Sequence, residues 1–363
     1  MKKVKIFLCI IFCYAYIFPI FNYVYTRNNV DSAYEAIDFK NDPSRKVRAN
    51  GILLPKIKQN YVKALFTPKH NGVIVFGNST QFHFQRKQFE KYYNCRLPAF
   101  FNFSHVGAEP FIISKLFNFY RKEILDAKTV IWAIYPSLFA IGARRAGETS
   151  FLPFRDLSLW VRDIRDGNSS IGGLFPRLIT ITWPGSKNEF FPIINYYKNR
   201  SDFGTPDKLN MLYRPDGSVR FHFMEQQLKE RLSVNSIIDT ENMKRGNAEN
   251  EKNPVMPLLL KSFEETVELL NSKSIKIFAY EPPFHPVATN IRLQRKKQRE
   301  TFLRFMRKIA NRYPHFRFIS DEVLLADISG KYWLDGSHIS DSGSFEIVRR
   351  LARRIPSEAI CEN

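Results

Sequence analysis

Five short apolar runs stand out along the chain after residue 71, each bounded by turn residues or polar segments. They are rich in β-branched and aromatic side chains, a composition typical of strands buried on both faces of a sheet. The runs are Val73–Phe76, Ala99–Phe103, Val130–Tyr135, Ile275–Tyr280 and Phe316–Ile319. We therefore predict five buried strands.

Helical patterns lie between several of these runs. Apolar residues recur at helical spacing in Pro110–Asp126, Leu258–Asn271 and Arg292–Arg312. Strands that alternate with helices predict a mostly parallel sheet covered on both faces. The fold class is therefore α/β, a three-layer doubly wound parallel sheet, and we place this domain at residues 71–355.

Two segments do not follow the alternation of strands and helices. Residues 27–70 are polar, basic and interrupted by proline, and we interpret them as a juxtamembrane tether. Residues 142–253 contain proline-rich turns and end in a polar stretch, Thr240–Asn253. This second segment is predicted to be an insertion on the α/β domain.

The N-terminus has the features of a membrane anchor. Three lysines among the first five residues precede the uncharged run Ile6–Tyr25, which is long enough to cross a hydrocarbon core as a helix. No small-residue cleavage site follows, so residues 1–26 favour a retained signal anchor over a removed signal peptide or a buried core helix. The lysines predict a cytoplasmic N-terminus. The expected location is the inner (cytoplasmic) membrane, single-pass, with the C-terminal domain extracytoplasmic or periplasmic.

The net charge of the chain restricts its possible binding partners. The chain has 55 Lys and Arg against 35 Asp and Glu, a formal charge of +20, which attracts polyanions such as nucleic acid, anionic lipid or an acidic polymer. The outward topology argues against nucleic acid. Basic residues concentrate in 292–312, either as a solvated helix face or as a surface that docks on anionic headgroups or an acidic glycan.

Four cysteines give little further information. Cys95 and Cys361 are the only two outside the predicted anchor, and they could form a disulfide or remain free thiols. No CxxC motif and no zinc-ligand spacing is present. We therefore predict no metal and no cofactor.

Polar residues follow the predicted strands at their carboxyl ends, where binding and catalytic groups of open α/β sheets collect. These residues are Asn78 and Ser79, His105 and Gly107, Glu281 and His285, and, in a glycine-containing loop beyond the last strand, Asp335 and His338. His105 and His285 could contact substrate or could be hydrogen-bonded structural groups, and Glu281 could orient the site.

Ser79, His338 and Asp335 together suit nucleophilic catalysis. A serine hydroxyl needs a base to take its proton during attack, and an aspartate can orient and stabilise the imidazole that does so. The N–H of a serine at a strand-to-helix turn can also bind a developing oxyanion. The structural alternatives are a helix N-cap at Ser79 and a self-bonded turn at Asp335–His338.

Two of these motifs resemble blocks of the SGNH (GDSL-type) hydrolase superfamily. Gly77-Asn78-Ser79 resembles its first block, usually Gly-Asp-Ser, and Asp335-Gly336-Ser337-His338 resembles its last block, Asp-x-x-His. The resemblance covers residues 72–354 except 142–253, and it implies a catalytic triad with Asn78 and Gly107 at the oxyanion or substrate site. The asparagine of the third block is missing, because the chain reads Ile134-Tyr135-Pro136-Ser137 there.

The missing asparagine is a common departure among membrane-anchored SGNH-like acyltransferases of bacterial envelope polysaccharides. The resemblance thus implies an extracytoplasmic O-acyl (acetyl) transferase or esterase that acts on an envelope glycan through an acyl-serine intermediate. It also implies a multi-spanning membrane protein as a partner that delivers the acyl group. The alternative is a catalytically inactive SGNH-like scaffold or glycan-binding module.

Overall fold

All residues that the structure describes belong to the unit formed by Asp42–Gly147 and Asp207–Asn363. The computed structural model describes residues 47–49, 72–105, 110, 113–114, 117, 124–139, 211–214, 216–221, 234–235, 237–239, 257–293, 296–320 and 328–361. The predicted anchor at 1–26, Gly107 and most of the predicted insertion lie outside these residues. Within them, no helix is both long enough and apolar enough to cross a bilayer.

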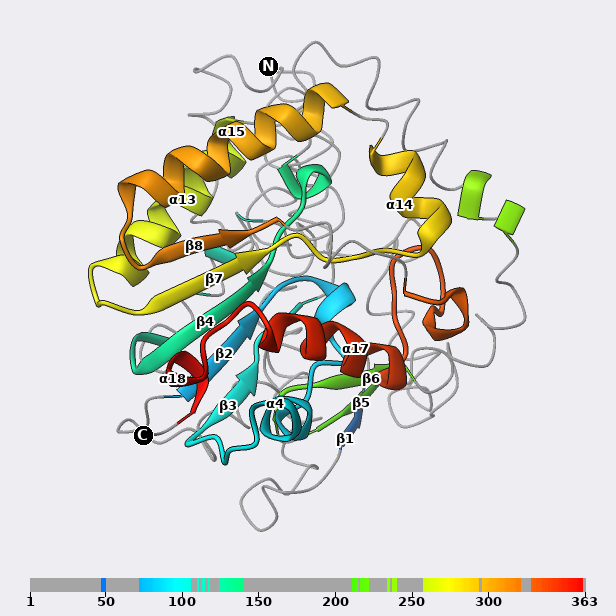
Figure 1. Ribbon diagram of the computed structural model, residues 1–363, viewed down its shortest axis with the longest axis horizontal. Helices are drawn as coiled ribbons and strands as arrows, with labels where there is room; N and C mark the ends of the chain where they lie inside the picture. Colours follow the sequence, from blue (N-terminus) through cyan, green and yellow to red (C-terminus); the bar gives the residue numbers. More distant parts are fainter. Residues whose placement is uncertain are drawn as a thin grey trace, which may run out of the picture. The chain divides into compact units, whose positions relative to one another are not determined.

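A five-stranded, all-parallel sheet forms the centre of this unit (Figure 1). Each strand lies within, or largely overlaps, one of the five predicted apolar runs, so the predicted α/β class and parallel sheet are confirmed. In spatial order the strands are β3 (Phe100–Asn102), β2 (Gly72–Phe76), β4 (Ala127–Ala133), β7 (Lys276–Tyr280) and β8 (Phe316–Ile319).

Helices cover both faces of the sheet, which explains why the strands are largely apolar. On one face, Ile131 and Tyr280 join a buried cluster with Val348 and Leu351. On the other face, Trp132 packs on Phe263, with ring centroids 4.7 Å apart. The first layer consists of α4 (Arg86–Tyr93), α17 (Asp341–Ala352) and α18 (Ser357–Ile360), and the second of α13 (Pro257–Asn271) and α15 (Lys296–Arg312).

Helix α15 shows how the amphipathic pattern sets the packing. It buries Phe302, Met306 and Ile309, and these side chains, spaced three and four residues apart, lie on one face of the helix. Its basic residues are largely on the exposed side. The predicted helix over 292–312 is confirmed as α15, except at its start, where residues 292 and 293 belong to the preceding helix α14 (Pro286–Leu293).

A small antiparallel sheet joins segments from the predicted tether and the predicted insertion. Its strand order is β1 (Val47–Ala49), β5 (Met211–Tyr213) and β6 (Val219–Phe221). The turn between β5 and β6 contains Gly217 at φ 75°, a conformation that favours glycine. The backbone N–H of Asn102 at the end of β3 donates to the carbonyl of Asp216 at 2.8 Å. The hairpin is thereby attached to the parallel sheet.

The two cysteines outside the predicted anchor form a disulfide in the structure. Cys95, just after α4, is bonded to Cys361, just after α18, across 266 residues of sequence. The bond ties the C-terminal segment to the helix that follows the first strand of the parallel sheet.

Candidate active site

Ser79 lies where the winding of the sheet changes direction. From β2 the chain passes to β3 on one side and then to β4 on the other. Open parallel sheets leave a crevice at such a point, outside the carboxyl ends of the strands. The short 3-10 helix η3 (Ser79–Gln81) begins there, and two residues separate it from the end of β2.

The turn that presents Ser79 is held by its neighbours. The Asn78 Oδ1 accepts hydrogen bonds from the N–H and the hydroxyl of Thr80, at 3.0 and 2.7 Å, and so caps the helix. A Cβ at position 77 would lie 2.2 Å from the Gln81 Oε1, so any residue other than glycine there would force the Gln81 side chain to move. Ser79 itself remains partly exposed, and its N–H belongs to the first turn, whose N–H groups have no partner inside the helix.

Asp335 and His338 belong to a tight loop between η8 (Gly330–Tyr332) and α17. An isolated antiparallel bridge between Trp333 and Ile339 closes the loop, and the Leu334 N–H donates to the His338 carbonyl at 2.7 Å. Trp333, Leu334 and Ile339 are buried. The two polar side chains are therefore carried by a hairpin anchored in the core.

The structure brings the three predicted side chains into one hydrogen-bonded chain. The Ser79 Oγ lies 2.8 Å from the His338 Nε2, although 259 residues separate them in sequence. The His338 Nδ1 lies 2.6 Å from the Asp335 Oδ2. The geometry expected of a serine–histidine–aspartate triad is thus present, whereas a catalytic role for these residues stays a prediction.

The ionisation of Asp335 determines which nitrogen of His338 carries a hydrogen. Burial alone would raise the pKa of Asp335, but the hydrogen bond from His338, the charge of that imidazole and the N–H groups of Ser337 and His338 outweigh it, and the pKa falls from 3.8 to about 2. An ionised carboxylate can only accept hydrogen bonds, so the His338 Nδ1 carries a hydrogen. In the neutral ring, the Nε2 is then left to accept the hydrogen of Ser79.

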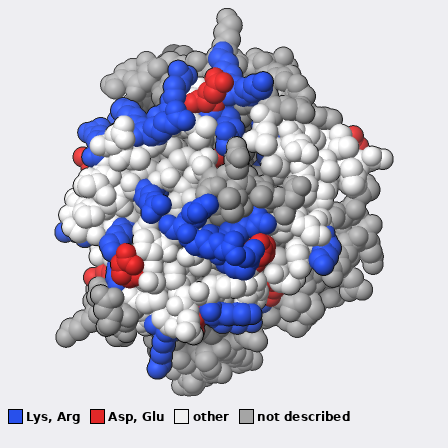
Figure 2. All heavy atoms as spheres, in the orientation of Figure 1, with Lys and Arg blue, Asp and Glu red and all other residues white. Residues whose placement is uncertain are grey.

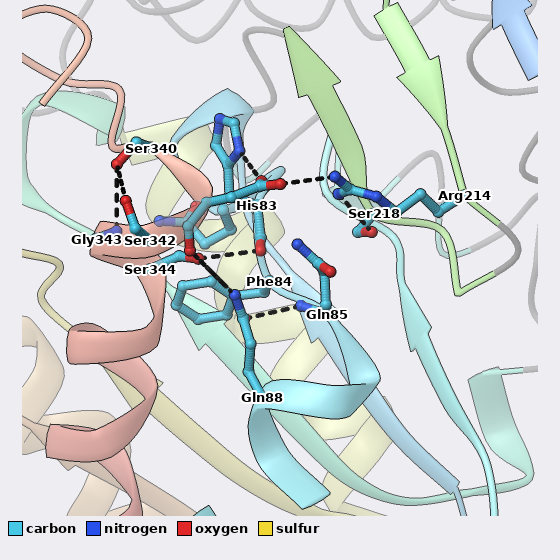
Figure 3. Close-up of polar contacts among 12 residues, drawn as sticks. His83, Phe84, Gln85, Gln88, Arg214, Ser218, Ser340, Ser342, Gly343 and Ser344 are labelled. Carbon is cyan, nitrogen blue, oxygen red and sulfur yellow. Dashed lines mark hydrogen bonds and ion pairs between the residues drawn. The ribbon is translucent and has the colours of Figure 1, made fainter. Parts of the chain in front are cut away.

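A second polar network holds the elements that carry the triad (Figure 3). The Asp341 carboxylate at the start of α17 contacts the His83 Nδ1 at 2.6 Å and the Arg214 Nη2 at 2.7 Å. Burial alone would raise the pKa of Asp341, but the contacts with His83 and Arg214 outweigh burial and lower the pKa from 3.8 to about 2. The Ser344 hydroxyl donates to the His83 carbonyl at 3.2 Å. This network joins the segment after Ser79, the helix after His338 and the β5–β6 hairpin.

His285 supports the triad loop through its backbone. Its N–H donates to the Gly336 carbonyl at 3.2 Å, and its Nδ1 accepts from the Val287 N–H at 3.3 Å at the start of α14. Burial lowers the pKa of His285. These contacts favour the structural interpretation of His285 over a role in substrate binding.

His105 and Glu281 are also placed at the carboxyl edge, but in buried positions. The His105 N–H donates to the Gly77 carbonyl at 3.0 Å, in the turn that presents Ser79. The Glu281 carboxylate accepts from the Arg299 Nη2 at 3.0 Å and from the Ser320 hydroxyl at 3.2 Å. Both residues therefore help to build the edge of the sheet, and Gly107, the other predicted oxyanion residue, lies outside the described residues.

Two residues near the triad were not predicted from the sequence as site residues. The Tyr135 hydroxyl accepts a hydrogen bond from the Asn78 Nδ2 at 2.5 Å, so the Asn78 side chain links the turn that presents Ser79 to the end of β4. The Arg292 Nη2 donates to the Ser337 hydroxyl at 3.1 Å. Tyr135 is the last residue of a predicted strand, and the rule that located Ser79 could have found it, whereas Arg292 was noted only as part of the basic segment 292–312.

Comparisons with known proteins do not assign the chain to a family. No protein-family model matches it, and no curated protein matches it. Within the described part of the chain, no group of three or more His, Cys, Asp or Glu side chains is arranged to hold a metal ion. The function is therefore argued from the site itself.

Proposed function

We propose that this protein is a serine-dependent O-acyltransferase or esterase of the SGNH type, with Ser79 as nucleophile, His338 as general base and acid, and Asp335 as the residue that orients the imidazole. The hydrogen-bonded chain from Ser79 through His338 to Asp335 carries the proposal. Its substrate is an O-acyl group, acetyl being the expected one, on an extracytoplasmic envelope glycan.

The order of the elements supports the SGNH assignment. Numbered along the chain, the parallel strands run 2-1-3-4-5 across the sheet, an order shared by doubly wound, flavodoxin-like sheets. The nucleophile follows the first of these strands, and the Asp335–His338 loop precedes helix α17. This is the arrangement that the resemblance to SGNH proteins implies.

The reaction proceeds in two half-reactions. The Ser79 Oγ attacks the acyl carbonyl while the His338 Nε2 takes its proton, and the tetrahedral intermediate collapses when the imidazolium returns that proton to the leaving hydroxyl. The acyl-serine is then attacked by a sugar hydroxyl or by water, which loses its proton to His338. Collapse returns a proton to Ser79 and releases the new ester or the free acid, so atoms and charges balance.

Oxyanion stabilisation is assigned to backbone donors. The Ser79 N–H is placed at the amino end of η3, where it can point at a developing negative charge. The resemblance supplies the Gly107 N–H as a second donor. The Asn78 amide, which contacts Tyr135, supports the oxyanion site by holding the turn and has a second amide hydrogen to offer.

The proposed location is the outer side of the cytoplasmic membrane, tethered by residues 1–26. The Cys95–Cys361 disulfide supports this location, because disulfides persist in oxidising compartments outside the cytoplasm. Lys and Arg side chains gather on the face shown in Figure 2, and such a surface suits an acidic glycan or anionic headgroups. A multi-spanning membrane protein is the proposed source of acyl groups.

The second candidate is an inactive SGNH-like scaffold that binds a glycan without turnover. The sequence Ile134-Tyr135-Pro136 favours it, because no asparagine stands where SGNH enzymes place an oxyanion donor. Labelling of the intact protein with a serine-directed fluorophosphonate distinguishes the enzyme from the inactive scaffold. We expect Ser79 to be labelled, and the label to be lost in Ser79→Ala and strongly reduced in His338→Ala. A folded wild-type protein that takes up no label would favour the scaffold.

A further inference from the structure

A pocket opens at the carboxyl edge of the sheet, beside the proposed triad. Within the described part of the chain, its lining includes Tyr135, Phe284 and Arg292, together with Glu281 and Arg299. Two contacts connect it to the catalytic groups. The Tyr135 hydroxyl meets the residue before Ser79, and Arg292 donates to Ser337, which lies between Asp335 and His338.

The guanidinium of Arg292 is held in one orientation. Its Cζ lies 3.6 Å from the centroid of the Phe284 ring and 5.8 Å from that of Tyr135. These two rings meet edge to face, with centroids 5.0 Å apart. A guanidinium stacked on aromatic faces keeps a fixed set of N–H donors, and this pre-organisation suits the recognition of planar anions.

The charge of the pocket favours an anionic ligand. Its described lining carries two guanidinium groups, from Arg292 and Arg299, and one carboxylate, from Glu281. That carboxylate already accepts hydrogen bonds from Arg299 and Ser320. A carboxylate or phosphate that entered the pocket would meet guanidinium donors in a forked geometry.

We propose that this pocket is the acceptor subsite of the proposed transferase, and that Arg292 binds an anionic group, a carboxylate or a phosphate, on the sugar to be acylated. The inference rests on the proposed function and names its substrate class, an acidic glycan. Tyr135, which is partly exposed, would contact the sugar ring, while Arg292, stacked on Phe284, holds its charge. Arg292 is therefore assigned as a residue that determines specificity.

The test measures binding without turnover, in full-length, detergent-solubilised Ser79→Ala protein at 0.15 M salt, where diffuse charge attraction is screened. The probes are trigalacturonate, its uncharged counterpart galactotriose, and galactotriose carrying one phosphate. We expect a charged probe to bind at least about tenfold more tightly than galactotriose, as one charge-assisted contact predicts. Whether trigalacturonate or the phosphorylated probe binds more tightly identifies the anionic group.

Variants of two arginines test whether the preference for a charged probe depends on Arg292. Arg292→Gln, added to Ser79→Ala, should abolish the preference for the charged probe, and Arg292→Lys should retain part of it. Arg307→Gln removes the same charge from an exposed position on α15 that does not line the pocket, and should leave the preference unchanged. Unfolding temperatures of all variants check that the fold is intact.

Three results would overturn the subsite: equal binding of charged and neutral probes, an equal loss from Arg292→Gln and Arg307→Gln, or no binding of any probe at millimolar concentration. Failure of the proposed function is seen separately, as a wild-type protein whose Ser79 is not labelled by the fluorophosphonate. An acidic-glycan preference that depends on Arg292 in a protein without labelling would leave the subsite intact on a scaffold.

Discussion

Asp341 offers a direct test of how the triad is supported, because it joins three elements without belonging to the triad. Its carboxylate contacts His83 at 2.6 Å and Arg214 at 2.7 Å, and 27% of its side chain is exposed. Asparagine has almost the same shape as the protonated acid. The variant Asp341→Asn therefore removes the charge while leaving the side chain in place.

The size of the effect follows from the pKa. A fall in the pKa of Asp341 from 3.8 to about 2 corresponds to about 2 kcal/mol of stability for the ionised form at neutral pH. Because the folded pKa lies below the unfolded one, this contribution is complete above the unfolded pKa and is lost as the pH falls through about 2. At pH 3 roughly half of it should remain.

Chemical unfolding of the solubilised protein at pH 7, 5 and 3 measures the difference. Asp341→Asn should lower the free energy of unfolding by about 2 kcal/mol at pH 7 and 5 and by about half as much at pH 3. Glu265→Gln is the control, because Glu265 pairs with Lys261 at 3.8 Å on the surface and 57% of its side chain is exposed, and such pairs contribute little. A loss of stability that is equal at all three pH values would refute the electrostatic explanation.

Three further predictions concern the triad, the disulfide and the topology. Ser79→Ala and His338→Ala should each abolish glycan acylation in cells, and Asp335→Ala should reduce it less. The double variant Ser79→Ala/His338→Ala should be hardly worse than either single variant, since losses within a triad are not additive. Normal acylation in cells that express Ser79→Ala well would exclude the mechanism. Replacing Cys95 and Cys361 by serine should cost about 2–4 kcal/mol in unfolding experiments, and an unchanged unfolding free energy would contradict a structural role for the bond. A reporter that is active only outside the cytoplasm should work when fused to the C-terminus, and an inactive, well-expressed fusion would exclude the proposed location.

The strands of the parallel sheet could be predicted from local composition. A strand covered on both faces must be apolar at successive positions, so runs such as Val73–Phe76 identify themselves without reference to the rest of the chain. The positions of Ser79 and of the Asp335–His338 loop followed from the rule that functional groups collect beyond the carboxyl ends of strands. The spacing of Asp335 and His338 is itself local, since one hairpin carries both.

Segments whose pattern is weak were less well predicted. The three residues of β1 lie in the predicted tether, but they pair with β5. Strands this short carry almost no periodic signal, and their pairing depends on where the parallel sheet places the β5–β6 hairpin. The start of the predicted helix over 292–312 was also imprecise, because residues 292 and 293 belong to α14 and α15 begins at Lys296.

The contacts between distant residues were decided by the tertiary structure alone. Ser79 meets His338 across 259 residues, and Cys95 meets Cys361 across 266. Arg292 reaches the triad loop only because α14 lies beside it. The entropic cost of closing a loop grows only slowly with its length, so sequence separation says little about which residues will meet. The sequence by itself therefore determined which local segments form strands and which side chains could carry chemistry, whereas the order of strands in the sheet decided which of those side chains stand within reach of one another.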